Sequence, residues 1–395
     1  MEITIEKSLL QDVFSRVAKV VEQKTISPIA GTVKMNVTED GLVLTAKGNE
    51  VFVQAIIEEN NFKLESDDTC SVCIPANLLV QLLPKLPQHL NGVIKLSVTP
   101  KAQGDYLLTI APPSSVKKDS KYQIDTLDGS SFFELPDIDK KNSIDLESSQ
   151  LLEIIDKVPF AAALQQVSVV LLGVQFYSRD DKLITVASDG HRLVELSLDC
   201  DSVPEEPINF LCYANGLLDL KDIFYFGEGS EMINVSYGDS HVRFAQGDKV
   251  VYVRLIDAEF PEYANGTPSA LVPNNFAAEI EVDSRELMEY IKPAAILTNV
   301  RLIMSFSPEG IVIKSESERG SSTDMVENIR WISGEPVKRV MFSAAYLGQQ
   351  LDKFQERVVL KLVGEDKPMV ISGDGYFHYL SCINIREDSV EDDDI

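Results

Sequence analysis

The residue types that most often do chemistry appear here as one Cys-x-x-Cys pair and one Ser-Asp-x-His run. Cys70 and Cys73 have the spacing of a zinc-binding or redox pair. A structural zinc site needs four ligands, and the sequence has no second cysteine pair and no histidine pair. A redox pair usually opens a helix, whereas residues 70–73 lie in an apparent strand. We therefore interpret both cysteines as small strand residues and expect no metal.

Ser188, Asp189 and His191 follow one another so closely that a catalytic triad has to be considered. Triad members converge from separate segments, whereas neighbours on a tight turn point apart. No phosphate-binding or dinucleotide-binding glycine motif occurs. We expect a non-catalytic protein with no catalytic residue and no cofactor. Metal-ligand spacing is also absent among the four histidines, which are His89, His191, His241 and His378.

The composition is that of a globular protein with an acidic surface. The chain has 395 residues, of which 44% are hydrophobic and 25% charged, and its net charge is −26. Such a charge repels nucleic acid and anionic membranes at long range. No apolar run is long enough to span a membrane, and the N-terminus has no signal-peptide pattern. We expect a cytoplasmic protein of two to four domains.

The elements that carry these residues recur three times along the chain. Segments beginning at Ile3, Ile144 and Ile280 each show a short alternating strand followed by an amphipathic helix of about three turns. A hairpin follows each helix, with turns at 38–41, 178–182 and 307–310. A second helix recurs at 74–79, 212–218 and 342–347, at near-equal offsets. The expected helix N-caps are serines: Ser8, Ser148 or Ser149, and Ser284.

This repeat predicts an α+β fold of three similar domains, each with two helices on antiparallel strands. The pattern breaks at 135–141 and again at 263–273, which we interpret as linkers. The predicted domains are therefore residues 1–139, 143–263 and 279–386. Residues 387–395 form an acidic tail with little that could pack.

The run from Val186 to Leu193, with the sequence VASDGHRL, resembles the ATDGHRL segment of the bacterial DNA polymerase III beta subunit, or beta sliding clamp, family. Five further segments resemble the same family in order and spacing: residues 25–29, 74–76, 127–136, 254–263 and 294–299. Each segment alone is too short to identify a family. Six segments in the same order and spacing, on a threefold repeat, make the resemblance specific. The resemblance covers nearly the whole chain.

The resemblance implies a head-to-tail homodimer whose six domains close into a ring around duplex DNA, with helices lining the hole and sheet outside. Such a processivity factor tethers the replicative polymerase and other motif-bearing partners, and a clamp loader places it on DNA. An acidic exterior then limits adhesion while the ring slides. The positions that match the family's DNA-facing residues are Arg16, Lys19, Lys24, Lys85, Lys157, Arg285, Lys292 and Lys353.

The sequence also departs from the family where direct DNA contact is expected. The family's RYYLNG, with its arginine and aromatic residues, is replaced by SVVLLG at 168–173. The basic stretch that usually follows AAILSN is shortened after Asn299. A second hypothesis therefore stays open, in which the chain is a clamp-fold peptide-binding scaffold that no longer carries DNA.

Two further residue sets follow from the resemblance. A partner-peptide cleft has apolar walls and a few polar groups, as suits a short amphipathic peptide. Its matching positions are Leu171, Ser188, Gly190, His191, Arg192, Leu193, Pro261, Tyr346, Ile383, Ile385 and Arg386. The subunit interface of the ring would contain Tyr122 and Ile124 on one side and Ile296 and Leu297 on the other.

Overall fold

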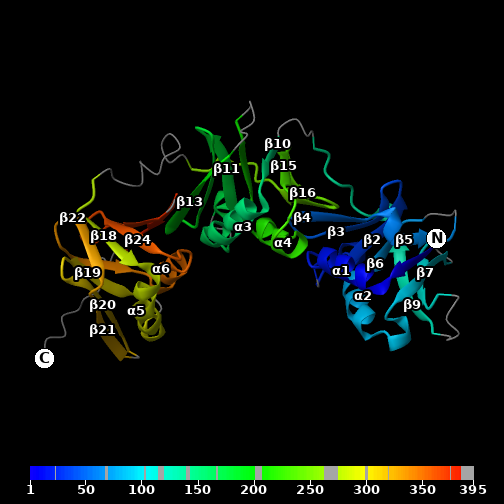
Figure 1. Cartoon of the computed structure of the whole chain (residues 1–395), viewed down its shortest axis with the longest axis horizontal. Helices are drawn as coiled ribbons and strands as arrows, with labels where there is room; N and C mark the ends of the chain where they lie inside the picture. The colour runs from blue at the N-terminus through cyan, green and yellow to red at the C-terminus, as the bar shows by residue number, and fades with distance from the viewer. Residues whose placement is uncertain are drawn as a thin grey trace. The chain divides into compact units, whose positions relative to one another are not determined.

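The computed structural model describes residues 1–22, 24–66, 70–101, 104–113, 120–138, 143–165, 168–200, 207–261, 275–298, 301–318, 320–373 and 375–383. The chain divides into two compact units. The first comprises Met1–Ile155, Pro204–Glu206 and Cys212–Asp257, and the second comprises Asp156–Val203, Pro207–Leu211 and Ala258–Ile395. In each unit the helices lie on one side of the strands (Figure 1).

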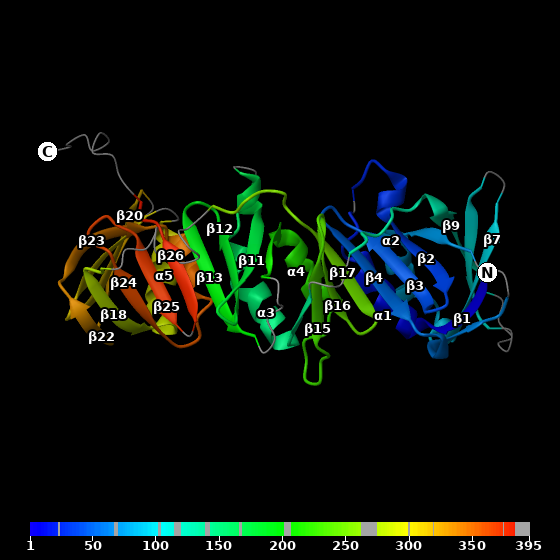
Figure 2. The same ribbon diagram turned by 90° about the horizontal axis from the view of Figure 1, so that it is seen from above.

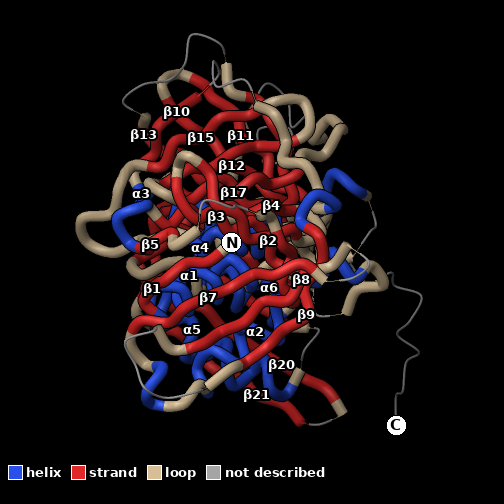
Figure 3. The backbone as a smooth tube through the Cα atoms, turned by 90° about the vertical axis from the view of Figure 1, so that its right-hand side faces the viewer, coloured by secondary structure: helices blue, strands red, loops and turns tan. Residues whose placement is uncertain are grey.

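The first unit is built on one antiparallel sheet of thirteen strands, ordered β10-β15-β16-β17-β4-β3-β2-β6-β9-β8-β7-β1-β5. Figure 3 shows β1, β7 and β8 side by side near the N-terminus. The strands are β1 (Glu2–Glu6), β2 (Thr32–Thr38), β3 (Gly41–Lys47), β4 (Val51–Ile57), β5 (Phe62–Leu64), β6 (Val72–Pro75), β7 (Val93–Pro100), β8 (Tyr106–Ala111), β9 (Tyr122–Asp128), β10 (Ser143–Leu146), β15 (Ile233–Tyr237), β16 (His241–Gln246) and β17 (Lys249–Arg254). The helices are α1 (Lys7–Ala18), α2 (Ala76–Leu82), α3 (Ser148–Lys157, ending in the second unit) and α4 (Ala214–Ile223).

The second unit has a nine-stranded sheet, ordered β14-β11-β12-β13-β26-β25-β24-β18-β22, and a four-stranded sheet, ordered β21-β20-β19-β23. Figure 2 shows β13 and β26 side by side in the larger sheet. The strands are β11 (Gly173–Arg179), β12 (Lys182–Ser188), β13 (Arg192–Asp199), β14 (Asn209–Tyr213), β18 (Ala278–Asp283), β19 (Leu302–Ser307), β20 (Gly310–Ser317), β21 (Gly320–Val326), β22 (Ile329–Gly334), β23 (Val337–Phe342), β24 (Arg357–Leu362), β25 (Met369–Gly373) and β26 (Tyr376–Leu380). The helices are α5 (Ser284–Leu297) and α6 (Ala344–Leu351).

The predicted repeat of elements is confirmed. A strand runs directly into a helix at β1 and α1, at β10 and α3, and at β18 and α5. The predicted hairpins are β2 with β3, β11 with β12, and β19 with β20. The second helices are α2, α4 and α6. The fold is therefore α+β with antiparallel sheets, as the alternating patterns predict.

The helices bury one apolar face against the sheets. In α5, Leu287, Ile291 and Ala294 are buried at helical spacing, and α6 contributes Leu347 and Leu351 to the same core. This shared core holds α5 and α6 against the strands that flank them.

Two of the predicted helix caps are wrong by one or two residues. Asp283, not Ser284, is the N-cap of α5, and its carboxylate accepts from the backbone N–H groups of Arg285 (2.9 Å) and Glu286 (3.1 Å). Helix α1 already begins at Lys7, so Ser8 lies in its first turn. In both cases the helix begins directly after the last residue of the strand, so the last strand residue stands at the cap position.

Candidate functional site

The turn between β12 and β13 holds the VASDGHRL run in a fixed conformation. The Ser188 hydroxyl donates to the Arg192 carbonyl oxygen (2.7 Å) and accepts from the Gly190 backbone N–H (3.1 Å). The Asp189 carboxylate accepts from the backbone N–H groups of His191 (2.9 Å) and Arg192 (3.0 Å). Gly190 has φ +88°, which favours glycine, because side chains with a Cβ rarely adopt it. The short spacing of the run is thus a requirement of the turn.

Arg192 is the centre of a buried polar and aromatic network. Its Nε donates to the Asp189 carboxylate (3.1 Å), and its two Nη atoms donate to the Gln349 side chain (2.5 Å) and the Phe160 carbonyl (2.7 Å). Its guanidinium lies 4.6 Å from the ring centre of Tyr346 and 5.0 Å from that of Phe160. The Arg192 side chain is only 6% exposed. It therefore orders the site more than it offers free donors to a ligand.

The aromatic wall of the site is formed by His191 and Tyr346. Their rings stack with centres 6.1 Å apart, which brings the turn to the first residues of α6. Burial, together with the neighbouring Asp189 carboxylate, raises the pKa of Tyr346. Leu171 lies beside the turn, since its Cδ1 would be 3.9 Å from a Cβ placed on Gly190. The structure thus gathers six of the predicted cleft residues around one turn: Leu171, Ser188, Gly190, His191, Arg192 and Tyr346.

Leu193 points to the opposite face of the sheet from Arg192 and is 4% exposed. It packs with Ile184 and Val186, and this cluster is covered by partly buried aromatic residues: Tyr177, Phe260, Phe377 and Tyr379. The predicted apolar wall is therefore closed in this structure. The four aromatic side chains separate Leu193 from solvent.

The structure describes only two of the four remaining predicted cleft residues, Pro261 and Ile383. Pro261 is exposed and follows Phe260 directly. The Ser381 backbone N–H donates to the His191 carbonyl (2.9 Å), and the Ile383 backbone N–H donates to the Met341 carbonyl (2.8 Å). The first bond brings the end of β26 to the turn, and the second joins the following residues to β23. Ile385 and Arg386 lie outside the described residues, as does the acidic tail.

Sequence reasoning missed Phe160 and Gln349 as parts of this site. Phe160 lies in a 3-10 turn, Pro159–Ala161, and Gln349 lies on α6, 157 positions from Arg192. No local pattern marks either residue, because their role depends on tertiary packing. Asp189 does carry a local signal, since an Asp that begins a tight turn commonly accepts from the backbone N–H groups that follow.

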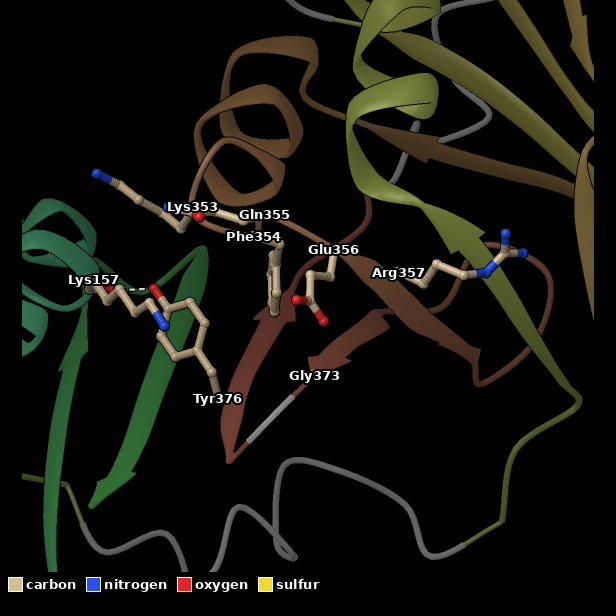
Figure 4. Close-up of a pocket in the computed structure, with 8 residues that line it drawn as sticks. All are labelled: Lys157, Lys353, Phe354, Gln355, Glu356, Arg357, Gly373 and Tyr376. Atoms are coloured by element: carbon tan, nitrogen blue, oxygen red, sulfur yellow. Dashed lines mark hydrogen bonds between the residues drawn. The ribbon is translucent and has the colours of Figure 1, made fainter. Parts of the chain in front are cut away.

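Two predicted DNA-facing lysines of the second unit meet at one pocket (Figure 4). The Lys157 ammonium lies 5.0 Å from the ring centre of Tyr376, and the Lys353 ammonium lies 5.0 Å from that of Phe160. The pocket has a volume of about 290 Å³ and is also lined by Phe354 and Gly373. The Tyr376 hydroxyl donates to the Lys157 carbonyl, which fixes the end of α3. Arg285 and Lys292 of α5 are exposed.

In the first unit, part of the expected positive charge is neutralised. Arg16 pairs with Asp12 one helical turn earlier (3.2 Å), and Lys19 pairs with Asp222 of α4. Burial and the neighbouring Asp222 raise the pKa of Asp219 to about 6. Lys24 and Lys85 are exposed. The helix surface around α1 and α4 therefore has a smaller positive potential than its lysine count suggests.

The predicted interface residues differ in exposure. On β9, Tyr122 is half-buried and Ile124 is 3% exposed, so Ile124 belongs to the core of the single chain. In the described residues, β9 pairs with β8 along Tyr122–Thr126 and meets β6 only near its end. On α5, Ile296 is 75% exposed and Leu297 is half-buried. β21 is an edge strand of its sheet.

The described residues contain no group of three or more His, Cys, Asp or Glu side chains placed to hold a metal ion. Cys70 precedes β6, and Cys73 is buried within it. Burial raises the pKa of the Cys73 thiol to about 11, which leaves it protonated and unreactive at neutral pH. Within the same part of the chain, every helix is too short or too polar to cross a membrane.

Comparison with known proteins gives a consistent result over most of the chain. The model for the N-terminal domain of the DNA polymerase III beta subunit matches residues 1–134, and the model for its central domain matches residues 145–262. The beta sliding clamp of Bacillus subtilis is 23% identical over 381 residues, which cover 94% of this chain and 95% of that protein. A Staphylococcus aureus beta sliding clamp is 23% identical over 383 residues, covering 95% and 96%.

Solved structures agree with these relatives. The crystal structure of the Bacillus subtilis DNA polymerase sliding clamp superposes with a TM-score of 0.88 at 21% identity, covering 98% of this chain and 100% of that one. The fold is therefore that of the DNA sliding clamps. With the domain models matched over residues 1–134 and 145–262, the chain belongs to the DNA polymerase III beta subunit family.

Proposed function

We propose that this protein is a DNA sliding clamp that encircles duplex DNA as a head-to-tail dimer and acts as a processivity factor without catalysing a reaction. The observation that carries the proposal is the clamp fold over 98% of the chain. DNA passes through the ring without sequence-specific contact, so a modest positive potential is sufficient. The test is retention on nicked circular plasmid, compared with linear DNA of equal length, in the presence of a clamp loader.

The dimer closes by pairing of two sheet edges. The free edge of β9 in one subunit lies against the four-stranded sheet of its partner, whose edge strand is β21. Exposed edges invite pairing, and the exposed Ile296 gains apolar burial in the same contact. Two such contacts related by a twofold axis close a ring and use both copies of this contact, so the assembly does not propagate through it.

The site around Arg192 is the docking cleft for linear peptide segments of the replicative polymerase, the clamp loader and other partners. Its wall of His191 and Tyr346 is partly exposed, and its apolar end at Leu193 opens when a covering side chain moves. A few apolar anchors in such a groove carry most of the affinity. Binding of a QLxLF-type peptide, measured by fluorescence anisotropy, tests this assignment.

Three structural domains, at residues 1–139, 143–263 and 279–386, and an acidic tail at 387–395 complete the proposal. The tail follows directly on the cleft positions Ile385 and Arg386. Its carboxylates repel acidic partners and shield the cleft. Deletion of residues 388–395 should raise peptide affinity at low salt and have less effect at high salt, because screening weakens the repulsion. Unchanged affinity at low salt would indicate an inert tail.

The alternative function is a peptide-binding scaffold with the clamp fold that no longer carries DNA. The pairing of Lys19 with Asp222 and of Arg16 with Asp12 favours it, because both pairs remove positive charge from the α1 region. The plasmid assay separates the two functions. A scaffold binds peptide in the anisotropy assay but is not retained on circular DNA.

A further inference from the structure

Glu195 occupies an unusual place in the apolar end of the cleft. It lies on β13 two residues after Leu193, so the two side chains share a face of the sheet about 7 Å apart. In the strand register Glu195 is opposite Val186 of β12 and Phe377 of β26. Both neighbours belong to the apolar cluster around Leu193 or cover it. A carboxylate is thus set into an otherwise apolar and aromatic surface.

The carboxylate of Glu195 has an oxygen without a donor. The residue is 8% exposed, and its Oε2 is buried with no hydrogen-bond partner in the described part of the chain. Burial raises the pKa of Glu195 to about 7, and the Arg179 charge on β11 opposes this rise. The other titratable groups on this face are Tyr177 of β11, Tyr379 of β26, and the ion-paired Lys182 of β12 and Asp199 of β13.

A buried carboxyl oxygen without a partner costs free energy, and such groups are few in native proteins. An apolar side chain in its place would avoid this cost within the cluster. The cost is offset if a donor arrives when the site is occupied. Phe377, one of the aromatic side chains that cover Leu193, lies opposite Glu195 on β26, so an anchor that displaces Phe377 exposes both Leu193 and Glu195 to the peptide.

We propose that Glu195 is a specificity-determining residue of the cleft, and that it selects peptides with a lysine or arginine within two residues of the apolar anchor. The proposal rests on the proposed peptide-binding function. The basic side chain donates a charge-assisted hydrogen bond to Oε2, which is stronger than a bond between neutral groups. The distance of about 7 Å between Leu193 and Glu195 matches residues i and i+2 of an extended peptide. The net charge of −26 also favours the approach of a cationic segment.

The experiment compares two QLxLF-type peptides that are identical except at the second position after the anchor, which is lysine in one and norleucine in the other. Anisotropy gives the dissociation constant of each at pH 6 and pH 8. The variants are Glu195→Gln, which keeps the shape and removes the charge, and Asp199→Asn. Asp199 is the matched control, because it lies on the same strand but its side chain is 90% exposed and pairs with Lys182.

At pH 8 the native protein should bind the lysine peptide about tenfold more tightly than the norleucine peptide, a factor that corresponds to about 1.4 kcal/mol. The ratio should shrink at pH 6, where Glu195 is protonated. Glu195→Gln should bring the ratio close to one by weakening the binding of the lysine peptide, whereas Asp199→Asn should leave the ratio unchanged. A ratio near one in the native protein, with tight norleucine binding, overturns the role of Glu195 but leaves the cleft. Failure to bind either peptide overturns the cleft assignment itself.

Discussion

The Arg192 guanidinium lies 4.6 Å from the ring centre of Tyr346 and donates to Gln349 on the same helix. One buried cation therefore joins the turn after β12 to helix α6. The turn and the helix are more than 150 positions apart in the sequence, and this side chain contacts both.

Replacing Arg192 with alanine should destabilise the protein strongly. The change leaves the Asp189 carboxylate, whose side chain is 10% exposed, without its charged partner. Removing one member of a buried ion pair typically costs about 3–5 kcal/mol. Urea unfolding of Arg192→Ala should show a loss of this order. Lys182→Ala, which breaks an exposed pair with Asp199, is the control and should change the midpoint little.

Replacing Tyr346 with alanine should weaken peptide binding by about tenfold, because truncation of an aromatic anchor residue commonly costs more than 1 kcal/mol. Tyr225→Ala removes a tyrosine that is 59% exposed in the first unit and serves as the control. Anisotropy with the norleucine peptide measures both. Equal losses of peptide affinity in Tyr346→Ala and Tyr225→Ala would contradict the assignment of Tyr346 to the peptide-binding cleft.

Replacing Asp222 with asparagine should increase the affinity for duplex DNA. The change removes a negative charge and frees the Lys19 ammonium from its ion pair. The gain should be largest at low salt and diminish as salt rises, because the effect is electrostatic. Glu50→Gln removes the acid of another ion pair, with Arg254 on β17, and should leave affinity nearly unchanged. Salt titrations of DNA binding compare the variants, and identical curves would contradict the placement of Lys19 toward DNA.

The ring predicts a dimer of about twice the 43.8 kDa of one chain. The double variant Ile296→Asp, Leu297→Asp should be monomeric, because it places charge in the apolar part of the interface. Ile332→Asp, at an exposed apolar residue of β22, is the control and should remain dimeric. Since each subunit carries a net charge of −26, sedimentation should show tighter association as salt increases. A monomeric native protein at moderate salt would contradict the ring.

His378 predicts a pH dependence of stability. It is fully buried among Phe160, Phe354 and Tyr376, and neither ring nitrogen has a hydrogen-bond partner in the described residues. Burial, with the nearby Arg192, Lys157 and Lys353 charges, lowers the pKa of His378 well below its usual value. The unfolded chain gains a proton below about pH 6.5 that the folded chain does not take up, so stability falls with pH there.

His378→Leu should remove part of this loss. The difference in unfolding free energy between pH 7.5 and pH 5.5, measured in urea, should be smaller in the variant than in the native protein. If the unfolding free energy of the variant and of the native protein changed equally between these two pH values, His378 would not be buried in its neutral form.

The strand and helix patterns predicted most of the local elements, because alternation and helical spacing report which face is buried. The same patterns did not identify the N-cap residues of helices α1 and α5 correctly. Ser284 and Asp283 are both good capping residues, and only the end of the β18 pairing with β24 decides between them. The family motif predicted the turn at Gly190, whose positive φ is a local requirement.

Contacts between residues that are far apart in the sequence could not be predicted from these local patterns. The pairing of β17 with β4 joins residues almost 200 positions apart, and no local pattern indicates it. Leu193 is covered by four aromatic side chains from three separate segments, which are β11, the stretch after β17, and β26. The roles of Phe160 and Gln349 around Arg192 arise from the same kind of contact.

The central claim is that the ring is linked to DNA by topology. The most direct measurement loads the labelled protein onto nicked circular plasmid, removes free protein by gel filtration, and then cuts the plasmid once with a restriction enzyme. Retention should last many minutes on the circle, and the protein should be released within seconds to minutes of linearisation as it slides off the ends. Equal lifetimes on circular and cut DNA, or no retention on the circle, would contradict the account.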